Sequence, residues 1–351
     1  MPLVSIILPI YNAEEYLDIC LRSLINQTYK NFEVLCIDDG SFDSSLKILN
    51  DYSAKDSRIK VFSQKNSGPA AARNLGIKNT AGKYLMFCDS DDWYEPNMVE
   101  EMVNAIEKYD TDIVMCDCNI HRNGEIINDN SIRYHKLKLI GDCEISTDNI
   151  AYINRVLWNK IFRKDIIENN KLSYPIKYEY DDCVFICMYL SVVKKYFGLD
   201  KTLYNYRLGN PNSIMGKLRS GKNINHEYDF CFAFQHLIDF YIKSKFVDEN
   251  IKQYFINFIY RCIKYFYSLL TPEKKSNAYI IIIDFVKKNV SFLKNDNFIS
   301  VLNCKSCKEL NYVFNLPIDY TLSQKFFSVF KIKNRIIIHF LGLKLTVKYK
   351  D

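Results

Sequence analysis

The sequence lacks any apolar run long enough to cross a membrane. A membrane-spanning helix needs about 18 or more mostly apolar residues in a row, and the most apolar segments, Tyr279–Val286 and Ile336–Leu343, are shorter. Met1–Asn12 has no basic start before its apolar run, so we expect no signal peptide. These absences predict a cytoplasmic protein without a membrane span.

The sequence also lacks the cysteine spacing of a zinc site, although it contains 12 cysteines. Cys304 and Cys307 form the only CxxC pair, and a structural zinc site usually needs a second pair or two histidines. Other cysteines, such as Cys20, Cys36 and Cys88, lie in apolar segments. We therefore expect reduced thiols that pack as small apolar side chains.

Excess charge is absent from most of the chain and is concentrated at its end. The net charge is +6, and residues 325–351 hold seven Lys or Arg against one Asp. A neutral body argues against a nucleic-acid binder, whose basic surface would belong to the fold. Within 343–350, apolar residues alternate with mainly basic ones, which predicts a strand with a basic face. This tail suits an anionic membrane surface or, alternatively, packing on the preceding helical region.

Strand and helix patterns alternate through the N-terminal part of the chain. The predicted strands are Val4–Ile10, Phe32–Ile37, Ile59–Phe62, Tyr84–Cys88 and Ile113–Cys116, with helices at about 12–24, 44–52, 69–78 and 95–108 between them. Near-continuous apolar strands joined by helices predict a mostly parallel α/β sheet with helices on both faces. Two further helices are predicted, at Tyr152–Phe162 and Asp181–Leu190.

The character of the sequence changes near residue 220. Long aromatic-rich helical patterns follow, at 226–240, 251–270 and 277–290. We therefore predict an α/β domain at 1–220, a helical accessory region at 221–323 and a basic apolar tail at 324–351.

Polar side chains follow four of the predicted strands. These positions are Tyr11 and Asn12, then Asp38 and Asp39, then Gln64 and Asn66, then Asp89, Asp91 and Asp92. The carboxyl ends of parallel strands meet at one edge of a sheet, where ligands bind. Carboxylates as close as Asp89 and Asp91 resist burial unless a cation meets them, and they suit Mg²⁺ or Mn²⁺ with a diphosphate. The alternative is a solvated turn that leads into the next helix.

Three stretches together resemble the family 2 glycosyltransferases, nucleotide-sugar enzymes of the GT-A fold. They read SIILPIYNAEEYLDICLRSLINQTYKNFEVLCIDDGSFDSS, QKNSGPAAARNLGI and GKYLMFCDSDDW, and they cover roughly residues 3–120. The resemblance implies inverting, metal-dependent transfer of a hexose or N-acetylhexosamine from a UDP-sugar to a glycan or lipid-linked acceptor. Such an enzyme would build a surface polysaccharide, capsule or lipo-oligosaccharide at the inner face of the membrane.

The resemblance also implies a donor site. Its residues are Pro9, Tyr11, Asn12, Glu14, Asp39, Asn66, Gly68, Arg73, Asn74, Asp89, Ser90 and Asp91. Asp39 would face the uracil N3–H, and the stretch from Asn66 to Asn74 would close over the uridine. Asp89 would face the ribose or β-phosphate, and Asp91 with Asp89 would hold Mn²⁺ or Mg²⁺. Alternatively, Tyr11 is only packed, and Arg73 is a helix-surface residue paired with an acid.

Asp181 and Asp182 stand where the family usually carries a Glu-Asp pair. The resemblance implies that Asp182 takes the proton of the acceptor hydroxyl as it attacks the anomeric carbon opposite UDP. Asp181 would be its neighbour, although Asp for Glu shortens this side chain and weakens any role that needs reach. The alternative is a pair of acids that only stabilises the start of a helix.

Two later stretches resemble the acceptor side of the family. They are Trp158–Arg163 and Tyr204–Ile214, in which Lys160 and Arg207 would offset phosphate charge as UDP leaves. Alternatively, both are ordinary surface or salt-bridged residues. The processive signature Q-x-x-R-W is absent, which favours a single addition.

Two other classes of function remain as alternatives. A nucleotidyltransferase would need a glycine-rich basic loop after the first strand, and LPIYNAEE has neither glycine nor lysine. A catalytically inactive sugar-binding scaffold would not need both the strand-end acids and the Asp181–Asp182 pair.

Overall fold

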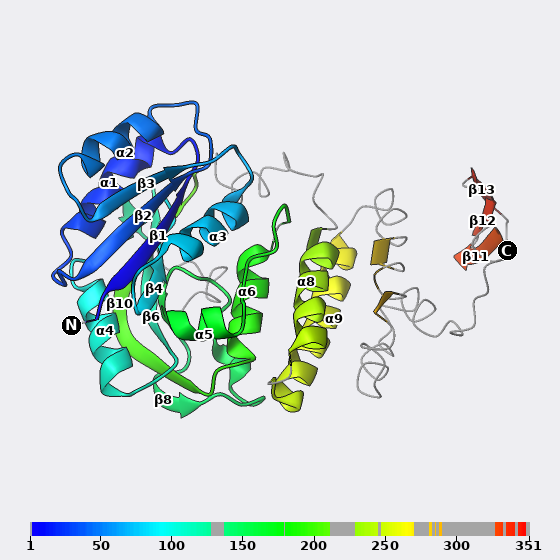
Figure 1. The fold of residues 1–351 in the computed structure, drawn as a ribbon. Coiled ribbons are helices and arrows are strands. Elements are labelled where there is room, and N and C mark those ends of the chain that lie inside the picture. The colour runs from blue at the N-terminus through cyan, green and yellow to red at the C-terminus, as the bar shows by residue number, and fades with distance from the viewer. Residues whose placement is uncertain are drawn as a thin grey trace. The chain divides into compact units, whose positions relative to one another are not determined.

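A computed structural model describes most of the N-terminal two thirds of the chain (Figure 1). It covers residues 2–127, 137–178, 180–210, 229–244 and 247–269, isolated positions between 281 and 289, and three strands after residue 326. The chain forms two compact units, Met1–Ile259 and Tyr260–Asp351. The boundary predicted near residue 220 lies outside the described residues.

The first unit is built on a ten-stranded mixed sheet in the order β3-β2-β1-β4-β9-β6-β10-β5, with β7 paired to β6 and β8 to β10. The strands are β1 (Val4–Ile10), β2 (Phe32–Asp38), β3 (Ile59–Ser63), β4 (Tyr84–Phe87), β5 (Trp93–Tyr94), β6 (Ile113–Arg122), β7 (Glu125–Ile126), β8 (Gly141–Glu144), β9 (Lys160–Arg163) and β10 (Lys195–Leu208). β1 to β4 are parallel, β6 is parallel to β10, and β9 runs antiparallel to both β4 and β6. The predicted mixed, mostly parallel sheet is therefore confirmed.

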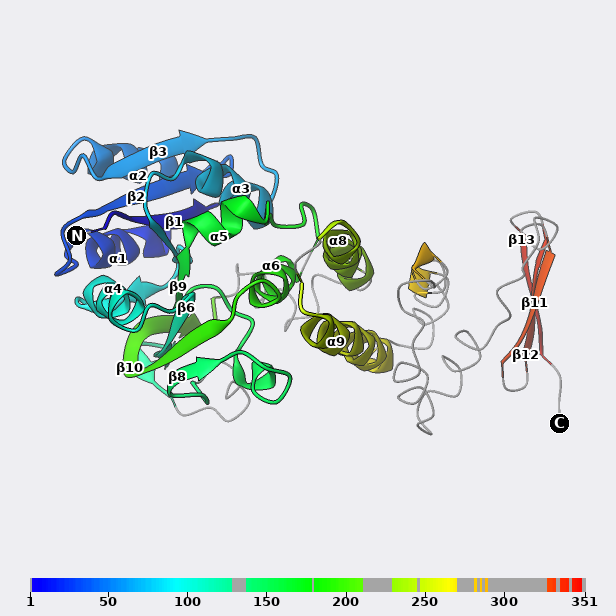
Figure 2. The same ribbon diagram turned by 60° about the horizontal axis from the view of Figure 1, so that its bottom comes forward.

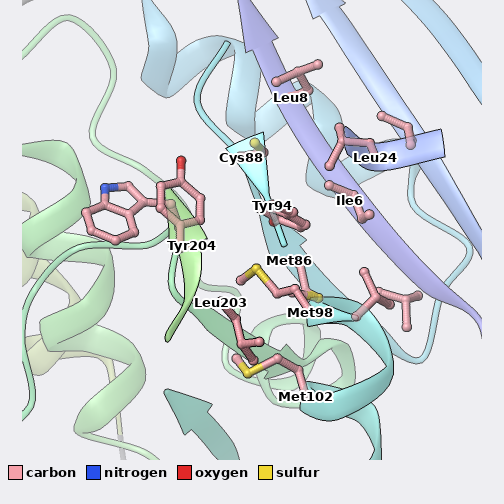
Figure 3. Close-up of a cluster of buried hydrophobic side chains, with 14 of the residues drawn as sticks. Ile6, Leu8, Leu24, Met86, Cys88, Tyr94, Met98, Met102, Leu203 and Tyr204 are labelled. Carbon is pink, nitrogen blue, oxygen red and sulfur yellow. The ribbon is translucent and has the colours of Figure 1, made fainter. Parts of the chain in front are cut away.

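Helices cover both faces of this sheet (Figure 2). They are α1 (Glu14–Ile25), α2 (Ser45–Ser53), α3 (Pro69–Asn79), α4 (Met98–Lys108), α5 (Lys164–Asn169) and α6 (Asp181–Leu190). On one face, Leu8 of β1 belongs to the same buried cluster as Leu24 of α1 and Met102 of α4 (Figure 3). On the other face, Ala72 of α3 packs against Leu35 of β2. Burying a side chain of the size of Leu or Met contributes about 1.5–3 kcal/mol. Both faces of the sheet are therefore covered by packed helices, while the ends of the strands are not.

Two predictions about local structure were wrong. The first helix begins at Glu14, after Ala13, whereas Asn12 has a left-handed φ of 48° and precedes it. The segment predicted as a helix at Tyr152–Phe162 ends instead in strand β9, after a short 3₁₀ turn. The reason is a period of two: Ile161 joins the cluster on one face, while Phe162 contacts Phe87 away from that cluster.

A helical region follows the α/β part, as predicted. α8 (Asp229–Lys243) and α9 (Glu249–Leu269) correspond to the predicted helices at 226–240 and 251–270. Aromatic rings join them, since Phe234 of α8 meets Phe258 of α9 edge-on at 6.2 Å. Most of the helix predicted at 277–290 lies outside the described residues. None of the described helices is long and apolar enough to span a bilayer.

The second unit contains a three-stranded antiparallel sheet. Its strands are β11 (Phe327–Ile332), β12 (Arg335–Phe340) and β13 (Leu343–Lys348), in that order. The strand predicted from alternation within the basic tail is thus confirmed as β13.

Candidate functional site

The carboxyl ends of β1, β2 and β4 carry the predicted donor-site residues. Pro9 lies inside β1, paired with Ile37, and Tyr11 follows the strand with 45% of its surface exposed. The Tyr11 ring meets Phe42 edge-on at 6.2 Å, and Phe42 is 82% exposed. An accessible aromatic pair therefore stands at the end of β1.

Asn12 and Glu14 hold the loop that follows β2. The Asn12 N–H donates to Ser41 Oγ at 3.0 Å, and its Oδ1 accepts from the Phe42 N–H at 3.0 Å. Glu14 Oε2 accepts from the Ser44 N–H at 2.8 Å. Both side chains thus fix the main chain of the loop after β2, which borders the carboxyl ends of the strands.

Asp39 joins the end of β2 to the stretch before α3. Its buried carboxylate accepts hydrogen bonds from Gln64 Nε2 at 2.7 Å and from the main-chain N–H groups of Ser67 and Gly68, both at 2.8 Å. Gly40 beside it has φ +73°, and a Cβ there would lie 2.9 Å from the Asn66 nitrogen. The structure therefore brings Asp39, exposed Asn66 and Gly68 close to one another.

Arg73 of α3 connects the strand-end acids with the acids of α6. Its Nη1 donates to Asp181 Oδ2 at 3.0 Å and to Asp182 Oδ1 at 2.7 Å, and its Nη2 donates to Asp89 Oδ1 at 3.1 Å. The Arg73 side chain is only 7% exposed. It is therefore a buried cation shared by three carboxylates, although the sequence left open a surface helix position.

Burial and this ion-pair cluster set the protonation of the site. Burial raises the pKa of Asp181 and, more strongly, that of Asp182, while Arg73 offsets part of this rise. Burial alone would lower the pKa of Arg73, but the three carboxylates outweigh it and raise that pKa. Asp182 is the more accessible of the pair, with 30% of its side chain exposed against 13% for Asp181.

Asp91 and Arg207 form the adjoining part of the site. Asp91 Oδ2 accepts from Asn210 Nδ2 at 2.8 Å, and Arg207 Nε donates to the Asp91 carbonyl oxygen at 2.8 Å. The Arg207 guanidinium lies 5.0 Å from the ring centres of both Tyr16 and Trp93. The structure thus brings Arg207 to the turn formed by Asp89, Ser90 and Asp91, here called the D-x-D turn. Ser90 lies half-buried in it.

The residues Asp89 and Asp91 suit a divalent cation chemically. Burial raises the pKa of Asp91, and the neighbouring carboxylate of Asp89 adds to this rise. A bound cation would relieve both effects, and oxygen ligands are those that Mg²⁺ and Mn²⁺ prefer. Among the described residues, however, no three His, Cys, Asp or Glu side chains are gathered as a ready cation site. Any metal would therefore complete its coordination with ligands other than such a cluster.

Lys160 lies beneath the site rather than at its surface. It is fully buried, and its Nζ donates to Asn154 Oδ1, to the Val156 carbonyl at 2.7 Å and to Asn159 Oδ1 at 2.8 Å. Burial lowers the pKa of Lys160 well below its ordinary value. Three neutral oxygens use its N–H groups, so its contacts are those of a structural residue.

Two residues next to the site, Asp92 and Tyr204, are not among the predicted donor-site or catalytic residues. Asp92 is buried and accepts from the Tyr204 hydroxyl and from the Arg207 N–H, both at 2.7 Å. The Tyr204 hydroxyl also accepts from the Asp89 N–H at 3.3 Å. Asp92 therefore fastens β10 to the D-x-D turn. The sequence signal for Tyr204 is its place three residues before Arg207 in the stretch Tyr204–Ile214.

Comparison with known proteins agrees with this architecture. The model of Glycosyl transferase family 2 matches residues 5–170. Putative glycosyltransferase EpsH of Bacillus subtilis is 34% identical over 187 residues, or 51% of this chain and 52% of that protein. Glycosyltransferase GlyA of Streptococcus pneumoniae is 33% identical over 58% of this chain and 30% of its own length. The chain thus spans about half or less of these two relatives.

A solved structure shows the same fold. S. aureus TarS in complex with UDP-GlcNAc superimposes with a TM-score of 0.70 and 20% identity, and the match covers 100% of both chains. The ten-stranded sheet with helices on both faces is therefore a GT-A fold. Residues 5–170, a little under half of the chain, are therefore similar to glycosyl transferase family 2.

Proposed function

We propose that this protein transfers a sugar from a UDP-sugar to a glycan or lipid-linked acceptor, with inversion at the anomeric carbon. One observation carries the proposal: Arg73 draws Asp89 at the end of β4 and the Asp181–Asp182 pair of α6 into one cluster. Residues suited to hold a donor diphosphate and residues suited to take a proton are thus adjacent. A simple binding module would not need both.

Asp182 is the proposed base. The acceptor hydroxyl oxygen forms a bond to the anomeric carbon, the bond from that carbon to the UDP oxygen breaks, and the hydroxyl proton passes to the Asp182 carboxylate. Burial raises the pKa of Asp182, so its carboxylate, when ionised, is a stronger proton acceptor than an exposed one. Asp181, which is more buried and shares Arg73, orients its neighbour.

The donor would occupy the strand-end edge. Pro9, Tyr11, Asp39, Asn66 and Gly68 would surround the uridine, with Asn12 and Glu14 holding the rim. Arg73, Ser90 and Arg207 would face the diphosphate. S. aureus TarS in complex with UDP and with UDP-GlcNAc supports a UDP-sugar for this chain. Lys160 is not included, because its ammonium group is buried and hydrogen-bonded to neutral oxygens.

Asp89 and Asp91 would hold Mn²⁺ or Mg²⁺. When bound, the cation would neutralise charge that develops on the leaving diphosphate. A mannosyltransferase of Pyrobaculum calidifontis, solved with GDP-Man and Mn²⁺, shares the fold at a TM-score of 0.50 and 13% identity. Support for the metal in this chain comes from the pair itself, since burial and the neighbouring Asp89 raise the pKa of Asp91 and a cation would offset both effects.

The transferred sugar would be a hexose or an N-acetylhexosamine, added once to a surface polysaccharide, capsule or lipo-oligosaccharide. Transfer to a lipid-linked acceptor on the cytoplasmic side would be favoured by contact with the membrane. The seven basic side chains of residues 325–351 would attract the protein to anionic lipid. Deletion of 325–351 should then weaken binding to vesicles that contain anionic lipid and leave UDP affinity intact. Equal vesicle binding by the full and shortened chains would contradict a membrane role for the tail.

Calorimetric titration of UDP tests the donor site. We expect UDP, and not GDP, to bind in the presence of Mn²⁺, and Asp91→Ala to abolish this binding. Asp51→Ala is the matched control, because Asp51 is exposed and, in the described part of the chain, forms an ion pair only with Lys47 on α2. If neither nucleotide binds with or without metal, the strand-end acids are not a donor site, and a scaffold protein becomes the better interpretation.

A further inference from the structure

The residue after Arg73 is engaged with the chain that leads into α6. Asn74 Oδ1 accepts from the Tyr174 main-chain N–H at 2.8 Å, and Asn74 Nδ2 donates to the Tyr174 carbonyl at 3.0 Å. Both polar atoms of one side-chain amide thus pair with both main-chain groups of one residue. This is the hydrogen-bonding pattern of two paired strands, made here by a side chain.

Tyr174 in turn contacts the elements that carry the carboxylates. Its ring stacks on Phe185 of α6 at 4.2 Å with an interplanar angle of 2°, and it meets Phe87 of β4 edge-on at 6.0 Å. The Arg73 guanidinium carbon lies 5.7 Å from the centre of the same ring. Phe185 is three residues after Asp182, and Phe87 is two residues before Asp89. A displacement of Tyr174 would therefore reach both groups of acids.

A second contact holds the same stretch from its other side. The Nε2 atom of His236, in α8, is 3.1 Å from the Ser173 carbonyl oxygen. Between this stretch and α6, Lys177 and Tyr180 have positive φ values of 77° and 69°. Non-glycine residues keep such conformations only where the surrounding structure enforces them. The position of the α6 N-terminus thus depends on contacts made outside α6.

We propose that Asn74 is a positioning residue for the Asp181–Asp182 pair, and that it acts through Tyr174 rather than by contact with the nucleotide. The inference rests on the proposed transferase function and deepens it, because it assigns different roles to two adjacent residues of α3. Arg73 donates hydrogen bonds to the carboxylates, while Asn74 fixes the position of the main chain that leads to them. The resemblance alone would instead place Asn74 at the uridine.

Replacing Asn74 by Ala removes both hydrogen bonds. We expect the affinity for UDP to stay within about twofold of wild type, since no nucleotide contact is lost. UDP release from a UDP-sugar should fall by tenfold to a hundredfold in kcat with an unchanged donor KM, because a misplacement of about 1 Å can cost about a hundredfold in rate. The acid limb of the pH–rate profile should also move to higher pH, as Asp182 loses part of its contact with Arg73. A role in stability alone would not move that limb.

Asn79→Ala is the matched control, since Asn79 lies on the same helix, is exposed and, among the residues that the structure describes, hydrogen-bonds only to the Leu75 carbonyl of its own helix. Hydrogen exchange supplies a readout that needs no substrate. The Tyr174 amide should exchange faster in Asn74→Ala than in Asn79→Ala or wild type. If Asn74→Ala does not fold, Asn74→Asp serves instead, because it keeps the acceptor for the Tyr174 N–H and replaces the donor to the Tyr174 carbonyl by a second carboxylate oxygen. Its Tyr174 amide should then exchange at an intermediate rate.

The outcomes distinguish a failure of the proposal about Asn74 from a failure of the proposed transferase function. A loss of UDP affinity of tenfold or more in Asn74→Ala, with Tyr174 exchange unchanged, would make Asn74 a nucleotide ligand and overturn the proposal. Failure of wild type to bind UDP would count against the proposed function. The exchange rate of the Tyr174 amide would then still decide whether Asn74 holds this stretch.

Discussion

Replacement of Arg73 by Met should lower stability in a manner that depends strongly on pH. Arg73 is 7% exposed and donates to Asp182, Asp181 and Asp89 at 2.7, 3.0 and 3.1 Å. Met occupies a similar volume without charge, so the main loss is the cation itself. The three carboxylates would then share a buried region with no counter-charge from α3.

The expected magnitude follows from the geometry. Two unit charges about 3 Å apart interact by about 5 kcal/mol at an effective dielectric constant of about 20. Desolvation cancels much of that gain, and removing one partner of a buried pair typically costs about 3–5 kcal/mol. We expect a loss of this size in the free energy of unfolding at about pH 8.

The sign of the pH dependence comes from the carboxyl groups. Burial raises the pKa values of Asp181 and Asp182 above the value of about 3.9 expected in the unfolded chain. A group with a raised pKa stabilises the fold while protonated, and this contribution is lost as pH rises. Without Arg73 both pKa values rise further, so the variant should lose more stability than wild type between about pH 5 and pH 8. We expect a deficit of about 1–2 kcal/mol at the lower pH.

Denaturant unfolding of wild type and Arg73→Met at several pH values measures this difference. Arg58→Met is the control, because Arg58 pairs with Asp56 at 2.6 Å away from the site and lowers the pKa of that carboxyl. Stability from a lowered pKa is lost only as pH falls below about 4, so this control should show a constant deficit from about pH 5 to pH 8. A constant deficit for Arg73→Met as well would refute the reasoning.

Two further substitutions test buried polar groups near the site. Within the described structure, the buried Tyr174 hydroxyl has no hydrogen-bond partner. Tyr174→Phe should therefore leave the free energy of unfolding unchanged or raise it by up to about 1 kcal/mol, as measured by thermal or denaturant unfolding. A loss of stability would show that the hydroxyl is hydrogen-bonded. Lys160→Met should lower the free energy of unfolding by about 3–5 kcal/mol in the same measurement, because it leaves three buried acceptors without a donor. The folded variant should bind UDP as wild type does. A stable variant with weakened UDP binding would instead give Lys160 a role at the phosphates.

The sequence was sufficient to predict the kind of fold and the row of polar strand ends. Alternating strand and helix patterns dictate a parallel sheet, and parallel strands present their ends together, so Asp39 and Asp89 could be placed on one edge without coordinates. The helix at Asp181–Leu190 was also predictable from its acidic start and apolar continuation.

Contacts between distant segments were not predictable. Arg73 pairs with Asp181 and Asp182, which follow it by 108 and 109 residues, and no local pattern specifies such partners. The same holds for Lys160, whose burial depends on oxygens that three-dimensional packing brings to it. The misassigned segment at Tyr152–Phe162 shows the related limit for short apolar runs. Its last residues form a strand because β4 and β6 pair with them on either side.

The interleaved strand order constrains where the gene can be cut to obtain an expressible fragment. β9 lies between β4 and β6 although it follows both in the chain, and β10 pairs with β6 along most of its length. A fragment that ends near residue 120, where the recognisable motifs end, would leave β4 and β6 with open edges inside what should be the centre of the sheet. Such edges invite pairing with other molecules. A fragment that keeps this sheet intact should therefore extend at least through Leu208, which completes the pairing of β6 with β10.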